Sequence, residues 1–309
     1  MGRKSRRNRS IAGAVIALCL LACLAIVGMY HIRLKREMES VRFEYEDINR
    51  NVDFLNGQIA EINAEAEGIK AETLLLSNIE ERIPEKKQEF HDLCRQLEEA
   101  VLADETDAKI AYLTFDDGPY TDTTPKYLDV LEEKNVLATF FQLGKPSEQY
   151  DPIYRRVYET GHTIANHTYS HRIKDGIYRS VDAFINDVIR NREFIENKLG
   201  YTTNILRFPG GSETAAYMGV KNGIVERLRE LGYGYVDWNI MTGDGTTWMT
   251  PQAYRDNILL HTDGRKILVV LMHDYSPNSL IALPEIIDGL REQGYTLLPL
   301  FYESSMVIK

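Results

Sequence analysis

Residues 109–119 read KIAYLTFDDGP, an apolar run that ends in two adjacent carboxylates and a Gly-Pro turn. The part from 110 to 115 has the length and the aromatic content of a buried strand. Asp116 and Asp117 follow it, and two adjacent carboxylates repel each other unless a cation or a proton lies between them. Alone, the segment could equally be a turn with solvated acids, so its meaning depends on the other strands.

Strands of this kind alternate with amphipathic helical stretches from residue 109 onwards. We predict helices at 125–135, 153–160, 181–199, 223–231, 251–261 and 279–293. Seven β/α repeats in about 200 residues predict an α/β fold with a parallel sheet, open or closed. In a closed barrel of this type the active site lies on the loops after the strands. The predicted strands are 110–115, 138–143, 162–166, 205–208, 235–240, 267–273 and 295–300.

A pair of histidines follows the third of these strands. Residues 166–171 read NHTYSH and place His167 and His171 four positions apart. Neutral imidazole is a good ligand for a borderline divalent metal such as zinc. Two histidines and one carboxylate leave coordination positions open for water and substrate, as a hydrolytic metal needs. Taken alone, such a pair could also be surface or core histidines.

Two further strand ends carry polar motifs. Residues 207–211 read RFPGG, in which Arg207 could clamp a carboxylate and a glycine leaves its backbone N–H accessible. Residues 271–274 read LMHD and end a very apolar strand, so His273 could act as a general acid. An ordinary surface turn and a core histidine are the alternatives for each motif alone. Together, the ends of four separate strands carry complementary parts of one hydrolytic site.

The four motifs, in this order, resemble those of the NodB-homology polysaccharide deacetylases, carbohydrate esterase family 4. The resemblance covers residues 109–309 and implies a distorted (β/α)7 barrel. It implies that Asp116 is the catalytic base and His273 the general acid. It also implies that Asp117, His167 and His171 bind a divalent metal, usually zinc, with Co²⁺, Ni²⁺ and Mn²⁺ as other candidates.

The same resemblance assigns supporting roles to three more residues. Arg207 matches the arginine that holds the base in place. Gly210 matches the residue whose backbone N–H binds the oxyanion, and Leu271 matches the wall of the acetyl-methyl pocket. The resemblance therefore implies a metal-dependent hydrolase that acts on the acetamide of an amino sugar.

The fourth motif of the family, D-x-x-D-W, is altered in this chain. One placement puts Met241 at the first Asp, Asp244 at the second and Gly245 where the family has a groove-lining Trp. A competing placement uses Asp237, which would lie inside a strand. We expect Asp244 to orient His273, and Trp248 is the candidate replacement for the missing Trp.

Composition narrows the classes of partner. The formal net charge of −10 argues against nucleic acid, whose phosphates favour basic surfaces. The cysteines are Cys19, Cys23 and Cys94, so the predicted catalytic domain can hold no disulfide. A region of about 200 residues can be stable through its hydrophobic core alone.

The N-terminal residues have the pattern of a membrane anchor. Residues 11–30 carry no charge, and twenty helical residues span about 30 Å, the thickness of a hydrocarbon core. Five basic residues precede this run and three follow, which favours a cytoplasmic N-terminus. We predict a cytoplasmic tail at 1–10, a transmembrane signal anchor at 11–32 and an extracytoplasmic remainder. A cleaved signal peptide and a lipoprotein cleaved before Cys23 are the alternatives, and both also place the remainder outside.

Residues 33–104 show a helical seam with apolar side chains spaced by three and four. We predict a coiled-coil stalk, because such a stripe is buried only against another helix, and this stalk could form a homo-oligomer. The alternative is a solitary charged helix that lies on the catalytic domain. The seam residues are Met38, Val41, Tyr45, Ile48, Val52, Leu55, Ile59, Ile62, Ala66 and Ile69, and the seam resumes at Phe90, Cys94, Leu97 and Val101.

The predicted activity is hydrolysis of the N-acetyl group of an extracellular polysaccharide, with peptidoglycan N-acetylglucosamine as the preferred substrate. Chitin oligomers, a matrix polysaccharide and O-acetylated xylan are the enzymatic alternatives. An alternative of another class is a non-catalytic scaffold that binds the cell wall. A broken metal triad would indicate the scaffold, and this sequence contains all three of the residues.

Overall fold

The computed structural model describes residues 33–35, 37–53, 55, 79–174 and 176–309. Its centre is one sheet in which every ladder is parallel, so the predicted α/β class is confirmed. The strand order is β5-β4-β3-β2-β1-β7-β6, and β8 also pairs with β1. The strands are β1 (Lys109–Asp116), β2 (Thr139–Gln142), β3 (Thr163–Asn166), β4 (Ile205–Leu206), β5 (Gly234–Tyr235), β6 (Ile240–Met241), β7 (Ile267–His273) and β8 (Tyr295–Leu298).

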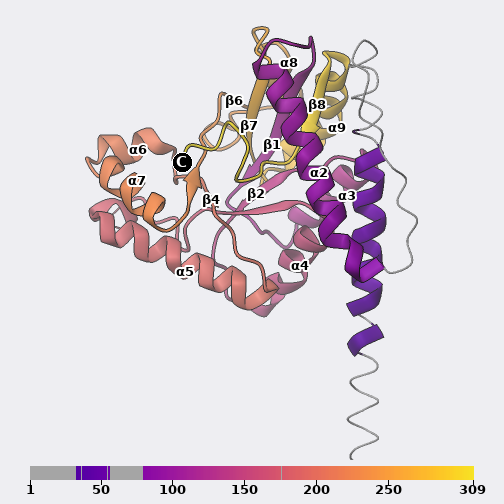
Figure 1. Ribbon diagram of the computed structural model, residues 1–309. Helices are drawn as coiled ribbons and strands as arrows, with labels where there is room; N and C mark the ends of the chain where they lie inside the picture. The colour runs from indigo at the N-terminus through magenta and orange to yellow at the C-terminus, as the bar shows by residue number, and fades with distance from the viewer. Residues whose placement is uncertain (1–32, 36, 54, 56–78, 175) are drawn as a thin grey trace, which may run out of the picture.

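The predicted strand 235–240 is wrong as a single element. It is divided into β5 and β6, which lie at opposite edges of the sheet, and the residues between them cross from one edge to the other. The carbonyls of Val236 and Asp237 in this crossing accept hydrogen bonds from the Arg207 side chain. Among the described strands no ladder joins β5 to β6, so the sheet is a curled, open half-barrel, which is consistent with the distorted (β/α)7 barrel that the resemblance implies (Figure 1).

Six helices lie within a few residues of their predicted positions, because the sequence signals at their ends are strong. Ser180, Thr250 and Ser276 cap α5, α8 and α9 by accepting a backbone N–H, and Gly200 ends α5 in the left-handed conformation. The short helix α6 (Ser212–Tyr217) was not predicted. The six are α3 (Thr124–Glu133), α4 (Asp151–Glu159), α5 (Val181–Leu199), α7 (Lys221–Glu230), α8 (Pro251–Leu259) and α9 (Pro277–Glu292).

The two faces of the sheet carry different side chains. Side chains alternate between the faces of a strand, so Leu113 and Phe115 of β1 point to one face, and they pack in the cluster that includes α3 and α9. Ile110 and Tyr112 point to the other face, here called the inner face, and belong to a second cluster. The same alternation places Asp116 on the inner face, so this face is apolar at the amino ends of the strands and polar at their carboxyl ends.

The N-terminal helices pack on the apolar part of the inner face. Helix α2 (Ile79–Leu102) and the helix of residues 37–53 lie on the same side of the domain (Figure 1). Most of the described seam residues are buried in one cluster with Ile110 and Tyr112, whereas Val41 is only partly buried and Met38 is exposed. The buried seam residues are Tyr45, Ile48, Val52, Leu55, Phe90, Cys94, Leu97 and Val101.

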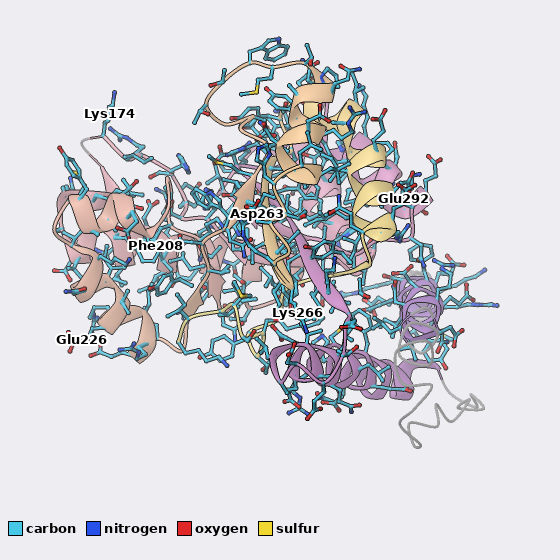
Figure 2. All side chains as sticks on the ribbon, turned by 90° about the horizontal axis from the view of Figure 1, so that it is seen from above. Lys174, Phe208, Glu226, Asp263, Lys266 and Glu292 are labelled. Carbon is cyan, nitrogen blue, oxygen red and sulfur yellow. The ribbon has the colours of Figure 1, made fainter. Side chains whose placement is uncertain are left out.

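The expectation of a self-associating coiled-coil stalk at 33–104 is therefore not supported, and the alternative of a helix lying on the catalytic domain fits better. An a/d seam shows only that a helix has one apolar stripe, and here the stripes of both N-terminal helices are buried in one cluster that includes residues of the sheet. Polar contacts fix α2 as well. Glu98, which is 5% exposed, accepts hydrogen bonds from Ser305 N (2.9 Å) and Oγ (2.6 Å). Lys266, beside α2 in Figure 2, donates to the carbonyl of Thr106 (2.9 Å).

The predicted basic tail at 1–10 and anchor at 11–32 lie outside the described residues, as do the seam positions from Ile59 to Ile69. In the part of the chain that the structure describes, no helix combines the length and the apolar character needed to cross a bilayer.

Candidate active site

The site lies at the carboxyl ends of the strands, on the inner face. Asp116 ends β1 and is 3% exposed. Its register partner on β7 is His273, so the two side chains stand side by side. Arg207, which follows β4 and is fully buried, donates to Asp116 Oδ1 (2.9 Å) and to Thr114 Oγ1 (2.6 Å). It also donates to the carbonyls of Val236 and Asp237, and these contacts hold the guanidinium in place beside Asp116.

Asp117, His167 and His171 converge as metal ligands would. Their ligand atoms all lie within 4.8 Å of one another. Asp117 Oδ1 is 3.4 Å from His167 Nε2 and 3.3 Å from His171 Nε2. This oxygen is buried and has no hydrogen-bond partner among the described residues. His167 Nδ1 lies 2.9 Å from the Arg207 carbonyl, so it carries the proton and leaves the Nε2 lone pair facing Asp117. The three side chains therefore fit a divalent metal.

Backbone strain is concentrated at this cluster. Asp117, Thr168 and His171 have φ angles of 73°, 65° and 53°, in the left-handed region that side chains other than glycine seldom occupy. Asp187 helps to hold the histidine loop, since its carboxylate accepts from Ser170 N (2.8 Å) and Oγ (3.0 Å). Strained residues that the surroundings hold in place are typical of functional sites.

The histidines and Asp117 influence one another's ionisation. Burial opposes ionisation of Asp117, but His167, and then His171 and His273, hold the pKa of its carboxyl well below the usual range. Burial and the neighbouring His167 lower the pKa of His171. The low pKa of Asp117 favours its carboxylate form, and the low pKa of His171 favours a neutral imidazole. These are the forms in which the two side chains bind a metal.

Asp244 contacts His273 in the way that an orienting carboxylate would. Its Oδ1 lies 2.8 Å from His273 Nδ1, and its Oδ2 accepts from His273 N (3.0 Å) and from Ser279 Oγ (2.6 Å). Burial lowers the pKa of His273, but the hydrogen bond to Asp244 and the charges of Asp116, Asp244 and Asp117 raise it to about 9. His273 therefore carries a proton at neutral pH.

The competing placement of the fourth motif, on Asp237, does not match the geometry. The Asp237 carboxylate accepts from Ser212 N (3.0 Å) and from Ser212 Oγ (2.5 Å), at the start of α6. Its role is to fix the loop that follows Arg207. Phe208 in that loop, which is labelled in Figure 2, stacks on Phe184 of α5 with ring centroids 5.1 Å apart.

Gly245, where the family has a groove-lining Trp, has no room for a side chain. A Cβ there would lie 2.4 Å from His273 Cε1. The candidate replacement, Trp248, is 75% exposed on the same loop after β6. Met249, next to it, is held through its backbone by Tyr254 and Asn278. Trp248 therefore projects from a fixed loop near the site.

Gly210 and Leu271 lie on the loop after β4 and on β7, the strand that ends in His273. Gly210 has φ 72° and is exposed, and among the described residues its N–H donates to no acceptor, whereas the N–H of Gly211 is taken by Phe208 O. The Gly210 N–H is thus available to a ligand. Leu271 precedes His273 by two positions on β7 and shares its face.

The sequence reasoning did not identify several supporting residues. Thr124 Oγ1 donates to the buried Asp274 (2.6 Å) and accepts from Tyr120 N (2.7 Å), which fixes the loop after Asp117. Ser279 orients Asp244, as described above. Thr124 directly precedes the predicted helix 125–135 and Ser279 begins the predicted helix 279–293, and hydroxyl residues are common at such positions as simple caps. That ambiguity is why these two residues were not identified.

Comparisons with known proteins agree with this geometry. Residues 103–236 match the family model described as polysaccharide deacetylase. A peptidoglycan-N-acetylglucosamine deacetylase of Bacillus cereus is 32% identical over 205 residues, covering 62% of this chain and 68% of the relative. A chitooligosaccharide deacetylase of Azorhizobium caulinodans is 29% identical, covering 61% of this chain and 91% of the relative.

A solved structure shows the same similarity. The catalytic domain of a peptidoglycan N-acetylglucosamine deacetylase from Eubacterium rectale superposes with a TM-score of 0.61 at 35% identity. The match covers 65% of this chain and 93% of that domain. The resemblance inferred from the four motifs is therefore confirmed.

Proposed function

This chain belongs to the polysaccharide deacetylase family, and from that membership and the site geometry we propose that it hydrolyses the acetamide of N-acetylglucosamine residues in peptidoglycan. The convergence of Asp117, His167 and His171 beside Asp116 and His273 is the observation that carries the proposal. The products are acetate and a glycan with a free amino group.

A divalent ion held by Asp117, His167 and His171 would polarise the acetamide carbonyl and acidify a water molecule. The donor set of two imidazoles and one carboxylate suits zinc, with Co²⁺, Ni²⁺ and Mn²⁺ as alternatives. The buried and unpartnered Oδ1 of Asp117 supports this assignment, because such an atom is costly unless a ligand satisfies it.

The other residues carry the proton transfers. Asp116, held by Arg207, accepts the proton of the attacking water. The Gly210 N–H donates to the oxyanion that develops on the former carbonyl oxygen, a contact whose removal typically costs about 3 kcal/mol. His273 then donates its proton to the departing nitrogen as the C–N bond breaks. Asp244 keeps that imidazole in position and its pKa high.

Peptidoglycan is the preferred substrate because the Bacillus cereus and Eubacterium rectale relatives are described as acting on it. The chitooligosaccharide deacetylase among the relatives makes chitin oligomers the second candidate. The intact hydrolytic set disfavours a purely non-catalytic scaffold.

The test measures acetate released from purified peptidoglycan and from chitin oligomers by the full chain in detergent, before and after chelation and after zinc is restored. We expect release from peptidoglycan that chelator abolishes and zinc restores. Equal release with and without chelator would remove the metal from the proposal. Preference for chitin oligomers would change the substrate but retain the reaction.

We also propose that the catalytic domain lies outside the cell membrane, anchored by residues 11–32, because that apolar run and its flanking charges support it. A C-terminal reporter that is active only outside the cytoplasm tests this topology. An active cytoplasmic reporter at the same position would contradict it.

A further inference from the structure

The loop that carries the two histidines, residues 166–171, depends on support from outside. Thr168 and His171 both have positive φ, and strained backbone of this kind persists only where the surroundings hold it. The loop begins at Asn166, the last residue of β3, which is fully buried. Side chains alternate along a strand, so Asn166 points away from the inner face while His167 points into the site. Contacts on the opposite face of the sheet therefore reach the loop through Asn166.

Helix α5 contacts this loop along one side of the helix. Asp187 accepts from Ser170, as described above, and its carbonyl accepts the N–H of Tyr169 (3.2 Å). The guanidinium of Arg190 lies 3.6 Å from the centroid of the Tyr169 ring. Asn191 follows Asp187 by four positions, so the two residues lie on the same side of α5.

Asn191 is linked to the backbone of the first histidine. Its side chain is fully buried, and its Nδ2 donates to the carbonyl of Gln142 (2.8 Å) and to Asn166 Oδ1 (3.1 Å). The Gln142 carbonyl also accepts the N–H of His167 (3.1 Å), and Asn166 Oδ1 also accepts the N–H of Thr168 (2.8 Å). One amide group thus joins the two acceptors that hold consecutive backbone N–H groups of the loop.

Folding stability alone does not account for an asparagine at position 191. Its Oδ1 is buried and has no hydrogen-bond partner among the described residues. A buried polar atom without a partner is unfavourable, and leucine has nearly the same shape without that atom. If Asn191 were replaced, each of its two acceptors would keep a second donor, the N–H of His167 or of Thr168. The contacts of Asn191 therefore contribute more to the geometry of the loop than to the stability of the domain.

We infer that Asn191 is a positioning residue, which through Asn166 and the Gln142 carbonyl sets the separation of His167 and His171 that a divalent ion requires. The inference rests on the proposed function, because that proposal assigns the metal to these histidines. Replacing a residue that orients metal ligands without binding the ion typically weakens metal binding by roughly 10- to 100-fold. An effect of this size is expected for Asn191.

The test measures the zinc affinity of the full chain in detergent by competition with a chromophoric chelator, together with the free energy of unfolding of the metal-free protein in urea. We expect Asn191→Leu to weaken zinc binding by roughly 10- to 100-fold while the unfolding free energy stays close to that of the wild type. Asn191→Ala removes the same contacts without the bulk of leucine and should weaken zinc binding as well. Asn186→Leu is the matched control, since Asn186 is an exposed asparagine on the same helix, and it should leave zinc affinity unchanged.

Wild-type zinc affinity in both Asn191 variants would overturn the inference. Zinc binding that weakens only in step with the unfolding free energy would also overturn it, because Asn191 would then act in folding alone. A wild-type chain that binds no zinc would overturn the metal assignment and this inference with it. Acetate release is measured separately, so a chain that binds zinc but releases no acetate contradicts the proposed activity alone.

Discussion

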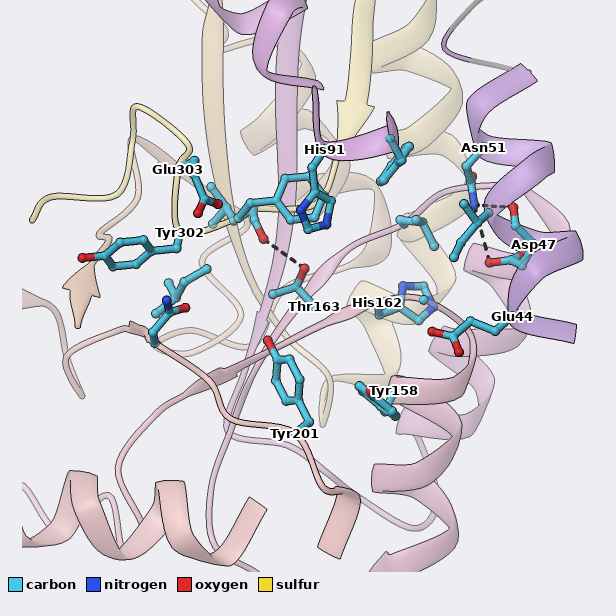
Figure 3. A pocket seen from close by; sticks show the side chains of 18 of the residues that line it. Glu44, Asp47, Asn51, His91, Tyr158, His162, Thr163, Tyr201, Tyr302 and Glu303 are labelled. Carbon is cyan, nitrogen blue, oxygen red and sulfur yellow. Dashed lines mark hydrogen bonds between the residues drawn. The ribbon is translucent and has the colours of Figure 1, made fainter. Parts of the chain in front are cut away.

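The two ends of the inner face contain similar side chains in different arrangements. At the carboxyl ends of the strands, one carboxylate and two imidazoles bring their ligand atoms within 4.8 Å of one another. At the amino ends, carboxylates and the imidazole of His162 surround a cavity of about 320 Å³, here called the far cavity (Figure 3). Residue types alone do not distinguish a metal site from a cavity lined by the same kinds of side chain. The distances between the polar atoms distinguish the two sites.

Backbone geometry shows the same contrast. Three residues of the convergent site have positive φ, whereas no described non-glycine residue lining the far cavity does. At the convergent site the strained residues lie beside the buried Arg207, which holds Asp116 in place. Four substitutions test this contrast, in order of decreasing expected effect.

The largest effect is expected from Asp116→Asn, which removes the base but no ligand of the convergent cluster. We expect kcat/KM for acetate release to fall by about 10²–10⁴, the contribution typical of a general base, while bound metal stays at the wild-type level. Steady-state kinetics and elemental analysis measure the two quantities. Asp122→Asn, an exposed carboxylate close by in sequence, is the matched control and should have no effect. Near wild-type activity in Asp116→Asn would refute the mechanism.

Asp244→Asn should change the pH profile. The pKa of His273 is raised to about 9 from an ordinary value near 6.5, so its acid form is present below that value and is lost as pH rises through it. Replacing Asp244 removes the main raising contact, and we expect the alkaline limb of kcat to move toward neutral pH. Activity at pH 8 should fall by roughly 10- to 100-fold. Ser279→Ala, which removes one hydrogen bond to Asp244, should move the limb less. An alkaline limb that does not move in Asp244→Asn would show that Asp244 does not tune the acid.

The sequence predicted the convergent end of this face well. Polar residues that follow apolar strands in register must meet at one edge of a parallel sheet, so the strand pattern alone was enough to group Asp116, His167, Arg207 and His273. Asp244 was placed beside His273 from its spacing to the family motif, and the structure shows that contact.

The far end could not be predicted in the same way. Its cavity depends on which partner covers the apolar seam of Tyr45, Ile48 and Leu97, and periodicity shows only that a partner exists. The division of 235–240 was missed for a similar reason. Arg207, distant in sequence, takes the carbonyls that a continuous strand would pair with a neighbour.

His162→Asn tests the far end through stability. The folded pKa of His162 is about 3 and the ordinary value is 6.5, so between these values the unfolded chain binds a proton that the folded chain does not. Stability must therefore fall as pH falls below 6.5, by about 2 kcal/mol at pH 5 from this residue alone. Asparagine can still accept the Ala138 N–H, which His162 Nδ1 accepts in the structure, but it does not titrate.

We expect urea denaturation of His162→Asn to show a smaller loss of unfolding free energy between pH 7 and pH 5 than the wild type shows. Other titrating groups contribute equally to both proteins and cancel in the difference. Parallel pH dependence in the two proteins would mean that His162 is not held neutral by burial.

The smallest effect is expected from Trp248→Ala, which tests whether the convergent end also has a sugar platform. Gly245 leaves no room for an aromatic ring beside His273, and Trp248 is the exposed ring on the same loop. Stacking on an exposed indole contributes about 1 kcal/mol, so KM for a long glycan should rise a few-fold while kcat is unchanged. A small acetyl ester, which cannot reach beyond the site, should be hydrolysed at the wild-type rate. Tyr217→Ala, which removes a ring that is 89% exposed at the end of α6, is the comparison. If both variants raise KM equally, exposed aromatic rings act without a specific platform, and the assignment of Trp248 fails.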